Sequence, residues 1–215
     1  MYKVCLDPGH MKGIDAGAAA NELNEEDLTL DICKRIKPLL EVNGIDVIMT
    51  RDGQSIAGVT SVSQSLQARC LIANKAQANV LVSVHINAGG GTGAETYVFA
   101  KGGQADQAAQ KVQQYLVLCG LVNRGVKVNP SLYVLKNTAM PAILTECGFV
   151  DNMYDASLLK TEDFRQRLAV AHAKGICEYF GQIYQDAGVV KESRTTDKNG
   201  QVLDLLKQAV KILEG

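Results

Sequence analysis

The run Val80-Leu81-Val82-Ser83-Val84 is apolar on both faces, and it limits the possible fold more than any other segment. A run of this kind is typical of a strand in the centre of a parallel sheet, where helices cover both faces. Further strands are predicted at 3–7, 45–50, 133–135 and 142–146, with another at 95–100 near an edge of the sheet. Because helical patterns alternate with these strands, we predict an α/β fold, a three-layer sandwich with a mainly parallel twisted sheet flanked by helices.

Helices are predicted where apolar residues recur at three- and four-residue steps. The first begins after Asn24, a favourable N-cap, and carries Glu25 and Glu26 in its first turn, where the helix dipole favours acids. Gly44 ends it, and another helix is expected around 107–118. The inward-facing residues expected in two further helices are Leu66, Cys70, Leu71 and Ala73 in one, and Phe164, Leu168, His172, Ile176, Tyr179 and Ile183 in a long closing helix.

Length and charge exclude several classes of protein. The chain has 215 residues, enough for one α/β domain with a sizeable core, or for a domain of about 180 residues and a short appendage. Its net charge is −1 and it has no lysine- or arginine-rich block, so nucleic acid is not an expected partner. No apolar run reaches the roughly 18 residues of a transmembrane helix, so no membrane span is expected.

Polar residues follow several of the predicted strands at their carboxyl ends. His10 follows the first strand, His85 ends the apolar run, and Glu146 ends the strand at 142–146. Ligands of open α/β sheets bind beyond these ends, so the side chains are expected on one rim. The remaining histidine, His172, lies on the apolar face of the closing helix and is predicted to be a core residue.

Two histidines and one carboxylate are a common ligand set for catalytic zinc. They leave a fourth position for a water molecule, whose pKa the metal lowers to about 7. A second carboxylate is then needed as the base that takes the proton of this water, and Glu146 is available. The carboxylate ligand is expected in the acidic segment after the His10 loop, where spacing alone leaves Glu22, Glu25 and Glu26 open.

The chain resembles the N-acetylmuramoyl-L-alanine amidases of the Amidase_3 type from residue 3 to about residue 184. The matching segments are Asp7-Pro8-Gly9-His10, the stretch from Glu25 to Ile32, Thr50-Arg51, Arg69, Ala73-Asn74, the stretch from Ser83 to Ala88, and Leu144-Thr145-Glu146-Cys147-Gly148-Phe149. Their order and spacing are those of the family. Two segments depart from it: Met11-Lys12 stand where Gly-Gly is usual, and Cys147 replaces a residue that is often different.

The resemblance implies a zinc enzyme that acts on bacterial peptidoglycan. It assigns His10, Glu25 and His85 as zinc ligands and Glu146 as the catalytic residue. The implied reaction is hydrolysis of the amide bond between the lactyl group of N-acetylmuramic acid and L-alanine. Arg69 and Asn87 are candidates for substrate binding. Arg69 could instead orient a carboxylate or cap a helix, and Asn87 could make a supporting hydrogen bond or turn the chain.

Other functions remain open at this point. A different zinc hydrolase, such as a peptidase or deacetylase, would use the same ligands, and a non-catalytic wall-binding module would use none of them. For the biological role, the first interpretation is a phage or prophage endolysin. The alternative is a host amidase in cell separation, germination or mother-cell lysis. Because Met1-Tyr2-Lys3 leads directly into the first strand, we expect a protein made in the cytoplasm without a signal peptide, which acts on the wall after release.

The C-terminal segment falls outside the resemblance. We predict a catalytic domain at 1–187, a polar linker at 188–200 and a short amphipathic helix at 201–215. An isolated helix shorter than about 12–15 residues barely forms in water, so this helix is expected to dock. Its possible partners are the catalytic domain, a wall-associated molecule, or a second chain in a homo-oligomer.

Overall fold

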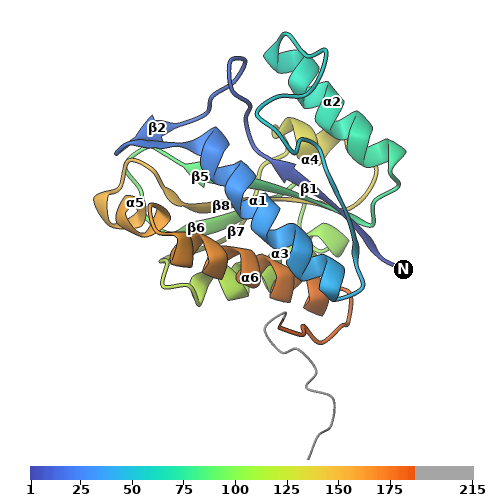
Figure 1. The fold of residues 1–215 in the computed structure, drawn as a ribbon. Coiled ribbons are helices and arrows are strands. Elements are labelled where there is room, and N and C mark those ends of the chain that lie inside the picture. The colour runs from blue at the N-terminus through green and yellow to red at the C-terminus, as the bar shows by residue number, and fades with distance from the viewer. Residues whose placement is uncertain (187–215) are drawn as a thin grey trace, which may run out of the picture. The chain divides into compact units, whose positions relative to one another are not determined.

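A sheet lies at the centre of the fold (Figure 1). It has six strands in the order β4-β1-β5-β8-β6-β7. The structure is a computed structural model that describes residues 1–186, of which Met1–Tyr184 pack together as one unit. Neighbouring strands run parallel, except for β6 against β8. In sheet order the strands are β4 (Asp46–Met49), β1 (Lys3–Pro8), β5 (Val80–Asn87), β8 (Ala142–Phe149), β6 (Ala94–Val98) and β7 (Asn123–Val128).

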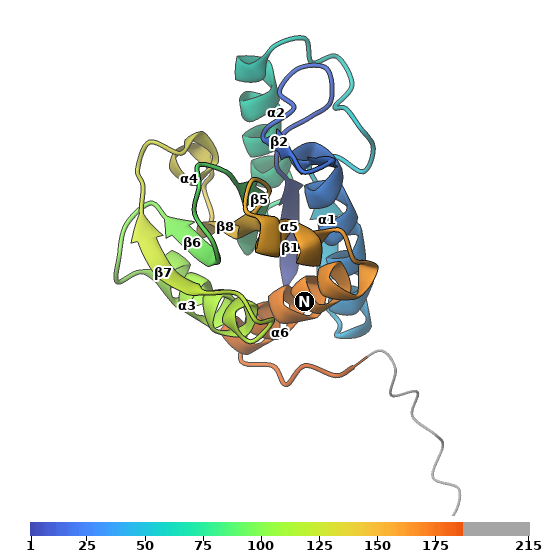
Figure 2. The same cartoon turned by 90° about the vertical axis from the view of Figure 1, so that its left-hand side faces the viewer.

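Helices cover both faces of this sheet, and the predicted α/β sandwich is confirmed. Figure 2 shows α1, α3 and α6 on one side and α2 and α4 on the other. The bounds are α1 (Glu25–Val42), α2 (Val62–Lys75), α3 (Gln104–Val117), α4 (Tyr133–Asn137), α5 (Met153–Leu159) and α6 (Glu162–Tyr179).

Strand β5 separates two apolar clusters, as its sequence predicts. Val82 and Val84 belong to the larger cluster, beneath α1, α3 and α6, whereas Leu81 belongs to the smaller cluster beneath α2 and α4. His172 is fully buried on the larger side, where it lies 3.0 Å from Thr145 Oγ1 and 2.7 Å from the Leu168 carbonyl oxygen. The prediction of a core histidine is therefore confirmed.

A small hairpin prepares the start of α1. Strands β2 (Ala19–Ala20) and β3 (Leu23–Asn24) pair antiparallel, and the two residues between them, Asn21 and Glu22, both have positive φ. Two such residues are the requirement of a type I′ turn. The hairpin leads directly from Asn24 into Glu25, the first residue of α1.

Several local predictions are wrong. The segment predicted as a strand at 133–135 is helix α4, because one helical turn buries Val134 and Leu135 together in the smaller cluster. Strand β7 was not predicted. It forms the edge of the sheet, and β6 lies next to it, near the edge as predicted. Leu71 is exposed, since the buried face of α2 consists of Ser65, Arg69, Cys70 and Ala73, and Ile183 is exposed beyond the end of α6.

The predictions for the C-terminal segment lie outside the described residues. These are the domain boundary at 187, the linker at 188–200, and the helix at 201–215 with its proposed role in a homo-oligomer. Within residues 1–186, no helix combines the length and the hydropathy of a membrane span.

Candidate active site

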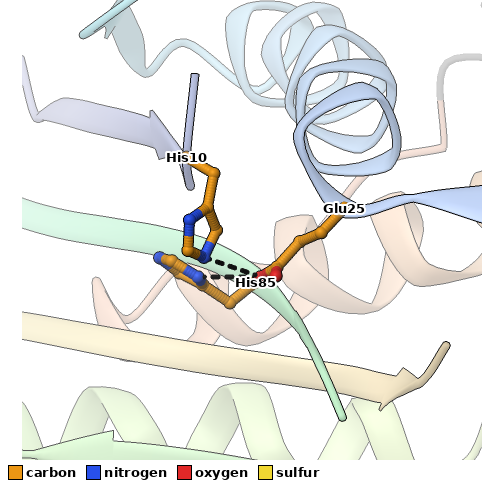
Figure 3. A group of neighbouring side chains, drawn as sticks. All are labelled: His10, Glu25 and His85. Carbon is orange, nitrogen blue, oxygen red and sulfur yellow. Dashed lines mark hydrogen bonds and ion pairs between the residues drawn. The ribbon is translucent and has the colours of Figure 1, made fainter. Parts of the chain in front are cut away.

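Three predicted ligands come together at the carboxyl ends of the parallel strands (Figure 3). His10 follows β1, His85 lies in β5, and Glu25 opens α1. One oxygen, Glu25 Oε1, lies 3.2 Å from His10 Nε2 and 3.0 Å from His85 Nδ1. The two rings meet edge to face with their centroids 4.8 Å apart. Of the acids that spacing left open, Glu25 is the one placed between the histidines.

The Glu25 carboxylate is also anchored to the main chain. Oε1 accepts a hydrogen bond from the Ile86 amide at 3.0 Å, and Oε2 accepts one from the Ala18 amide at 2.8 Å. Burial alone would raise the pKa of Glu25, but the hydrogen bonds and charges of the two histidines outweigh it and hold the pKa well below its usual range. Glu25 is therefore a fixed, ionised acceptor.

His10 adopts a backbone conformation that non-glycine residues rarely use, with φ 58°. Two buried arginines hold it there through its carbonyl oxygen: Arg51 Nε donates to it at 2.9 Å, and Arg69 Nη2 donates to it as well. On the ring, Nδ1 makes an ion-pair contact of 2.9 Å with Asp15 Oδ1. Burial alone would lower the pKa of His10, but Glu25 and Asp15 raise it to about 9. Backbone strain at this position is thus maintained by the surrounding structure.

Two glycines allow the side chains to approach the backbone closely. A Cβ atom at Gly9 would lie 2.4 Å from the His85 ring. A Cβ atom at Gly17 would lie 2.5 Å from Glu25 Oε2 and 2.7 Å from the His10 ring. The positions of His10, Glu25 and His85 therefore require residues without a side chain at 9 and 17.

Glu146 lies directly beside His85 in the sheet. The two residues are paired in register between β8 and β5, so their side chains leave the same face. Glu146 Oε2 is buried and has no hydrogen-bond partner among the described residues. Burial, with the charges of Glu25 and Glu95, raises the pKa of Glu146 well above its usual value. A carboxylate with a raised pKa is a stronger base than an ordinary surface carboxylate.

Glu95 is the next residue in register after His85 and Glu146, and sequence analysis did not identify it as a site residue. It is paired in register with Glu146 across β6 and β8, and it is almost completely buried. Its carboxylate binds Arg124 and Lys127 of β7, and also Tyr97 and Asn87. The signal that could have found it is a charged residue within a predicted strand, Ala94-Glu95-Thr96-Tyr97-Val98.

The two candidates for substrate binding lie close to the cluster but contact protein groups. Arg69 is buried under the His10 loop, where its Nη1 binds Asp7 Oδ1 and the Pro8 carbonyl oxygen, each at 2.5 Å. Asn87 Nδ2 donates to Glu95 Oε1 at 3.0 Å, and its Oδ1 accepts from the Ala88 amide. Through these contacts Arg69 positions the His10 loop, and Asn87 positions the end of β5.

A sequence profile described as N-acetylmuramoyl-L-alanine amidase, Amidase_3, matches residues 4–178. The chain belongs to this family. It is 36% identical over 195 residues to the amidase CwlM of Bacillus licheniformis, covering 89% of this chain and 74% of CwlM. It is 37% identical over 207 residues to an endolysin of Bacillus phage SPP1, covering 92% of this chain and 73% of the endolysin.

Solved structures of the amidase family share the fold. An N-acetylmuramoyl-L-alanine amidase from Clostridium difficile 630 superposes with a TM-score of 0.76 and 31% identity, covering 84% of this chain and 97% of the other. The CwlD amidase from Clostridioides difficile, solved with the GerS lipoprotein, superposes with a TM-score of 0.78 and 30% identity. The match covers 84% of this chain and 99% of the other. Together the comparisons support a cell-wall amidase function for this chain.

The donor set of this amidase fits a zinc ion. One ligand atom from each of His10, Glu25 and His85 lies within 4.8 Å of the others. The Asp15 carboxylate contacts the second ring nitrogen of His10, Nδ1, at 2.9 Å. Histidines that bind zinc commonly have a carboxylate at this position. Two imidazoles and one carboxylate with a further carboxyl at hand are the composition of a hydrolytic zinc site.

Proposed function

We propose that this chain is a zinc-dependent N-acetylmuramoyl-L-alanine amidase, with His10, Glu25 and His85 as the metal ligands and Glu146 as the general base. The observation that carries the proposal is the convergence of the three donors next to a buried carboxyl that has no partner within residues 1–186. The proposed reaction cuts the amide bond between N-acetylmuramic acid and L-alanine in peptidoglycan.

The protein groups around the bond have separate tasks. Zinc, when bound, supplies a Lewis acid that polarises the carbonyl and lowers the pKa of water. Glu146 Oε2 takes a proton from the attacking water and delivers it to the nitrogen of the leaving L-alanine. The raised pKa of Glu146 suits both steps, because the carboxyl must hold the proton between them. Arg51 and Arg69 position the loop that carries His10 through its carbonyl oxygen and that of Pro8.

Mass spectrometry of digested peptidoglycan tests the reaction. An amidase frees the amino group of L-alanine and creates no new reducing sugar, and a chelator should abolish this. Release of other peptide amines would indicate a peptidase, and loss of acetyl groups a deacetylase. Binding to the wall without any cleavage would indicate a non-catalytic module and contradict the proposal.

Two variants separate the metal ligands from the base. Glu146→Gln keeps the shape of the side chain, so it should retain zinc and lose at least about 100-fold in rate. His85→Ala should lose the metal itself, and His10→Ala likewise. Full zinc content in both histidine variants would overturn the metal assignment, and near-normal activity of Glu146→Gln would overturn the role of Glu146.

For the biological role we propose a phage or prophage endolysin. The similarity to the SPP1 endolysin supports it, and the similarity to a sporulation-specific amidase of Bacillus subtilis, 36% over 184 residues, supports the host alternative. The time of expression decides between them. An endolysin should accumulate after prophage induction, whereas a host amidase should accumulate during cell separation, sporulation or germination without it.

A further inference from the structure

Glu95 gathers two positive charges beside the proposed active site. Its Oε2 accepts hydrogen bonds from Arg124 Nε at 2.7 Å and from Lys127 Nζ. Its Oε1 accepts hydrogen bonds from Tyr97 Oη at 2.7 Å and from Asn87 Nδ2 at 3.0 Å. One carboxylate therefore faces two cations, and a surplus of one positive charge remains at this end of the row.

A β-bulge brings Arg124 to this position. The pairing of β6 with β7 runs from Ala94 and Asn123 directly to Glu95 and Gly125, so Arg124 is an extra residue. Gly125 supplies the positive φ, 78°, that the bulge requires. As the unpaired residue of the bulge, Arg124 is free to turn its side chain to Glu95. The guanidinium group lies over the Phe149 ring, with Cζ 5.0 Å from the ring centroid.

Both cations keep donors that a ligand can reach. The side chain of Arg124 is 33% exposed and that of Lys127 is 39% exposed, whereas Glu95 is 2% exposed. Within residues 1–186, Arg124 Nη1 and Nη2 have no hydrogen-bond acceptor, and Lys127 Nζ has only Glu95. A single cation would be enough to neutralise Glu95. The planar pair of free nitrogens on Arg124 has the geometry that a carboxylate fits.

The distance from Glu146 matches a short stretch of peptide. His85, Glu146, Glu95 and Gly125 are in register across four neighbouring strands, in the order seen in Figure 2. Strands lie about 4.8 Å apart, so Gly125 lies about 10 Å from Glu146 across the sheet. An extended peptide covers about 3.3–3.6 Å per residue, so this distance corresponds to about three residues.

On the basis of the proposed amidase function, we propose that Arg124 and Lys127 form a carboxylate-binding subsite for the peptide part of the substrate. The carboxyl group of the muramic acid is consumed in the amide bond that is cut. Free carboxylates of the substrate therefore lie on the peptide that begins with L-alanine. The subsite holds one of them within the first three residues or so, and it selects acidic peptides over amidated ones.

A matched pair of substrates tests this subsite. Both are N-acetylmuramoyl peptides that begin with L-alanine, and in one every free carboxylate is replaced by a primary amide. For Arg124→Gln and Lys127→Gln, KM for the acidic substrate should rise about tenfold, the loss of one charged hydrogen bond, with kcat nearly unchanged. KM for the amidated substrate should stay at the wild-type value, and Arg124→Lys should recover part of the loss.

Lys111→Gln is the matched control. Lys111 lies on α3, which covers the opposite face of the sheet, and it is paired with Glu178. This variant should change neither KM. An equal rise in KM for both substrates in the Arg124 and Lys127 variants would assign these residues a structural role only and overturn the subsite, and so would no change at all.

Calorimetry on the wild-type protein keeps the subsite separate from the proposed reaction. The free acidic peptide that begins with L-alanine should bind at least about tenfold more tightly than its amidated form. If the protein cuts neither substrate, the amidase proposal fails, but this comparison still decides the subsite. Equal affinity for the two peptides would overturn the subsite. This measurement uses only the wild-type protein, so it decides the subsite even if the glutamine variants do not fold.

Discussion

Arg69 and Asp7 form a buried ion pair beneath the His10 loop, with Arg69 Nη1 2.5 Å from Asp7 Oδ1. Burial alone would raise the pKa of Asp7, but the charge of Arg69 and the hydrogen bonds from Thr50 and Ser83 outweigh it and lower the pKa. The same guanidinium group binds the carbonyl oxygens of Pro8 and His10. The ion pair therefore connects the end of β1 to the conformation of a proposed metal ligand.

Replacing Arg69 by methionine should destabilise the protein by about 3–5 kcal/mol, because Asp7 would be left as an unpaired buried charge. The additional change Asp7→Asn should recover part of this loss. Lys37→Met is the control: Lys37 pairs with Glu41 at the surface of α1, so its loss should cost less than about 1 kcal/mol. Urea unfolding measures all four proteins. A loss below 1 kcal/mol for Arg69→Met would show that the pair contributes little.

The strands that carry the site could be predicted because their sequences are unambiguous. Val80 to Val84 are apolar on both faces, and His85 and Glu146 follow apolar runs. The edge strand β7 could not be predicted, because Asn123-Arg124-Gly125-Val126-Lys127-Val128 contains a bulge and a glycine that interrupt the alternation. In α4, the apolar residues Val134 and Leu135 suit a strand or a helical turn equally, and packing in the smaller cluster decides.

The site shows the same division. His10 and His85 could be recognised from strand ends and from the family motifs. The choice of Glu25 among the three acids needed the resemblance, because all three are close in sequence. Glu22 lies in the hairpin turn, and Glu25 and Glu26 are consecutive residues in the first turn of α1. Glu95 was missed because its partners Arg124 and Lys127 come from a strand about 30 residues further along the chain, which no local pattern connects to it.

Exchanging the three acids for alanine one at a time should distinguish the proposed ligand. Glu25→Ala should lower zinc affinity by more than the roughly 10–100-fold loss that is typical of an outer-shell partner, because a ligand itself is removed. Glu22 is the control: its side chain is 88% exposed and paired with Lys160, so Glu22→Ala should bind zinc normally. Glu26→Ala should also bind zinc with normal affinity. Competition with a chelator measures the affinities, and a zinc loss centred on Glu22 or Glu26 would show that the assignment of Glu25 is incorrect.

The stability of the protein should fall in mild acid because of His172. Burial lowers the pKa of this histidine to about 4, whereas the unfolded chain has about 6.5. A depressed pKa means that the unfolded state binds the proton first. The contribution of His172 is therefore complete above pH 6.5 and is lost as the pH falls towards 4, by about 3 kcal/mol in all.

Urea unfolding at several pH values measures this effect for the wild type and for His172→Gln. The difference in unfolding free energy between the two proteins should shrink by about 2 kcal/mol from pH 7 to pH 5, because only the wild type carries the titrating group. Groups that titrate in both proteins cancel in the difference. A difference independent of pH would mean that His172 has the same pKa in the folded and unfolded states.

Gly17 and Gly13 offer a test of how closely the His10 loop must approach the ligands. Both have positive φ, 70° at Gly17 and 80° at Gly13, so alanine should strain the backbone similarly at either position, by about 1 kcal/mol. Only at Gly17 does a Cβ atom meet the site, 2.5 Å from Glu25 Oε2, whereas at Gly13 it meets nothing within 4 Å. Backbone strain is thus the same in the two variants, and the steric contact differs.

Gly17→Ala should therefore lose zinc affinity and amidase activity by at least about tenfold, because Glu25 or the His10 ring must move away from the added methyl group. Gly13→Ala should keep both and lose only stability. Zinc binding, peptidoglycan hydrolysis and thermal unfolding, measured on the two variants side by side, separate the effects. If both variants lose activity in proportion to their stability, the loop acts through its backbone conformation alone. If neither loses zinc, the close approach of Gly17 to Glu25 is not needed to hold the metal.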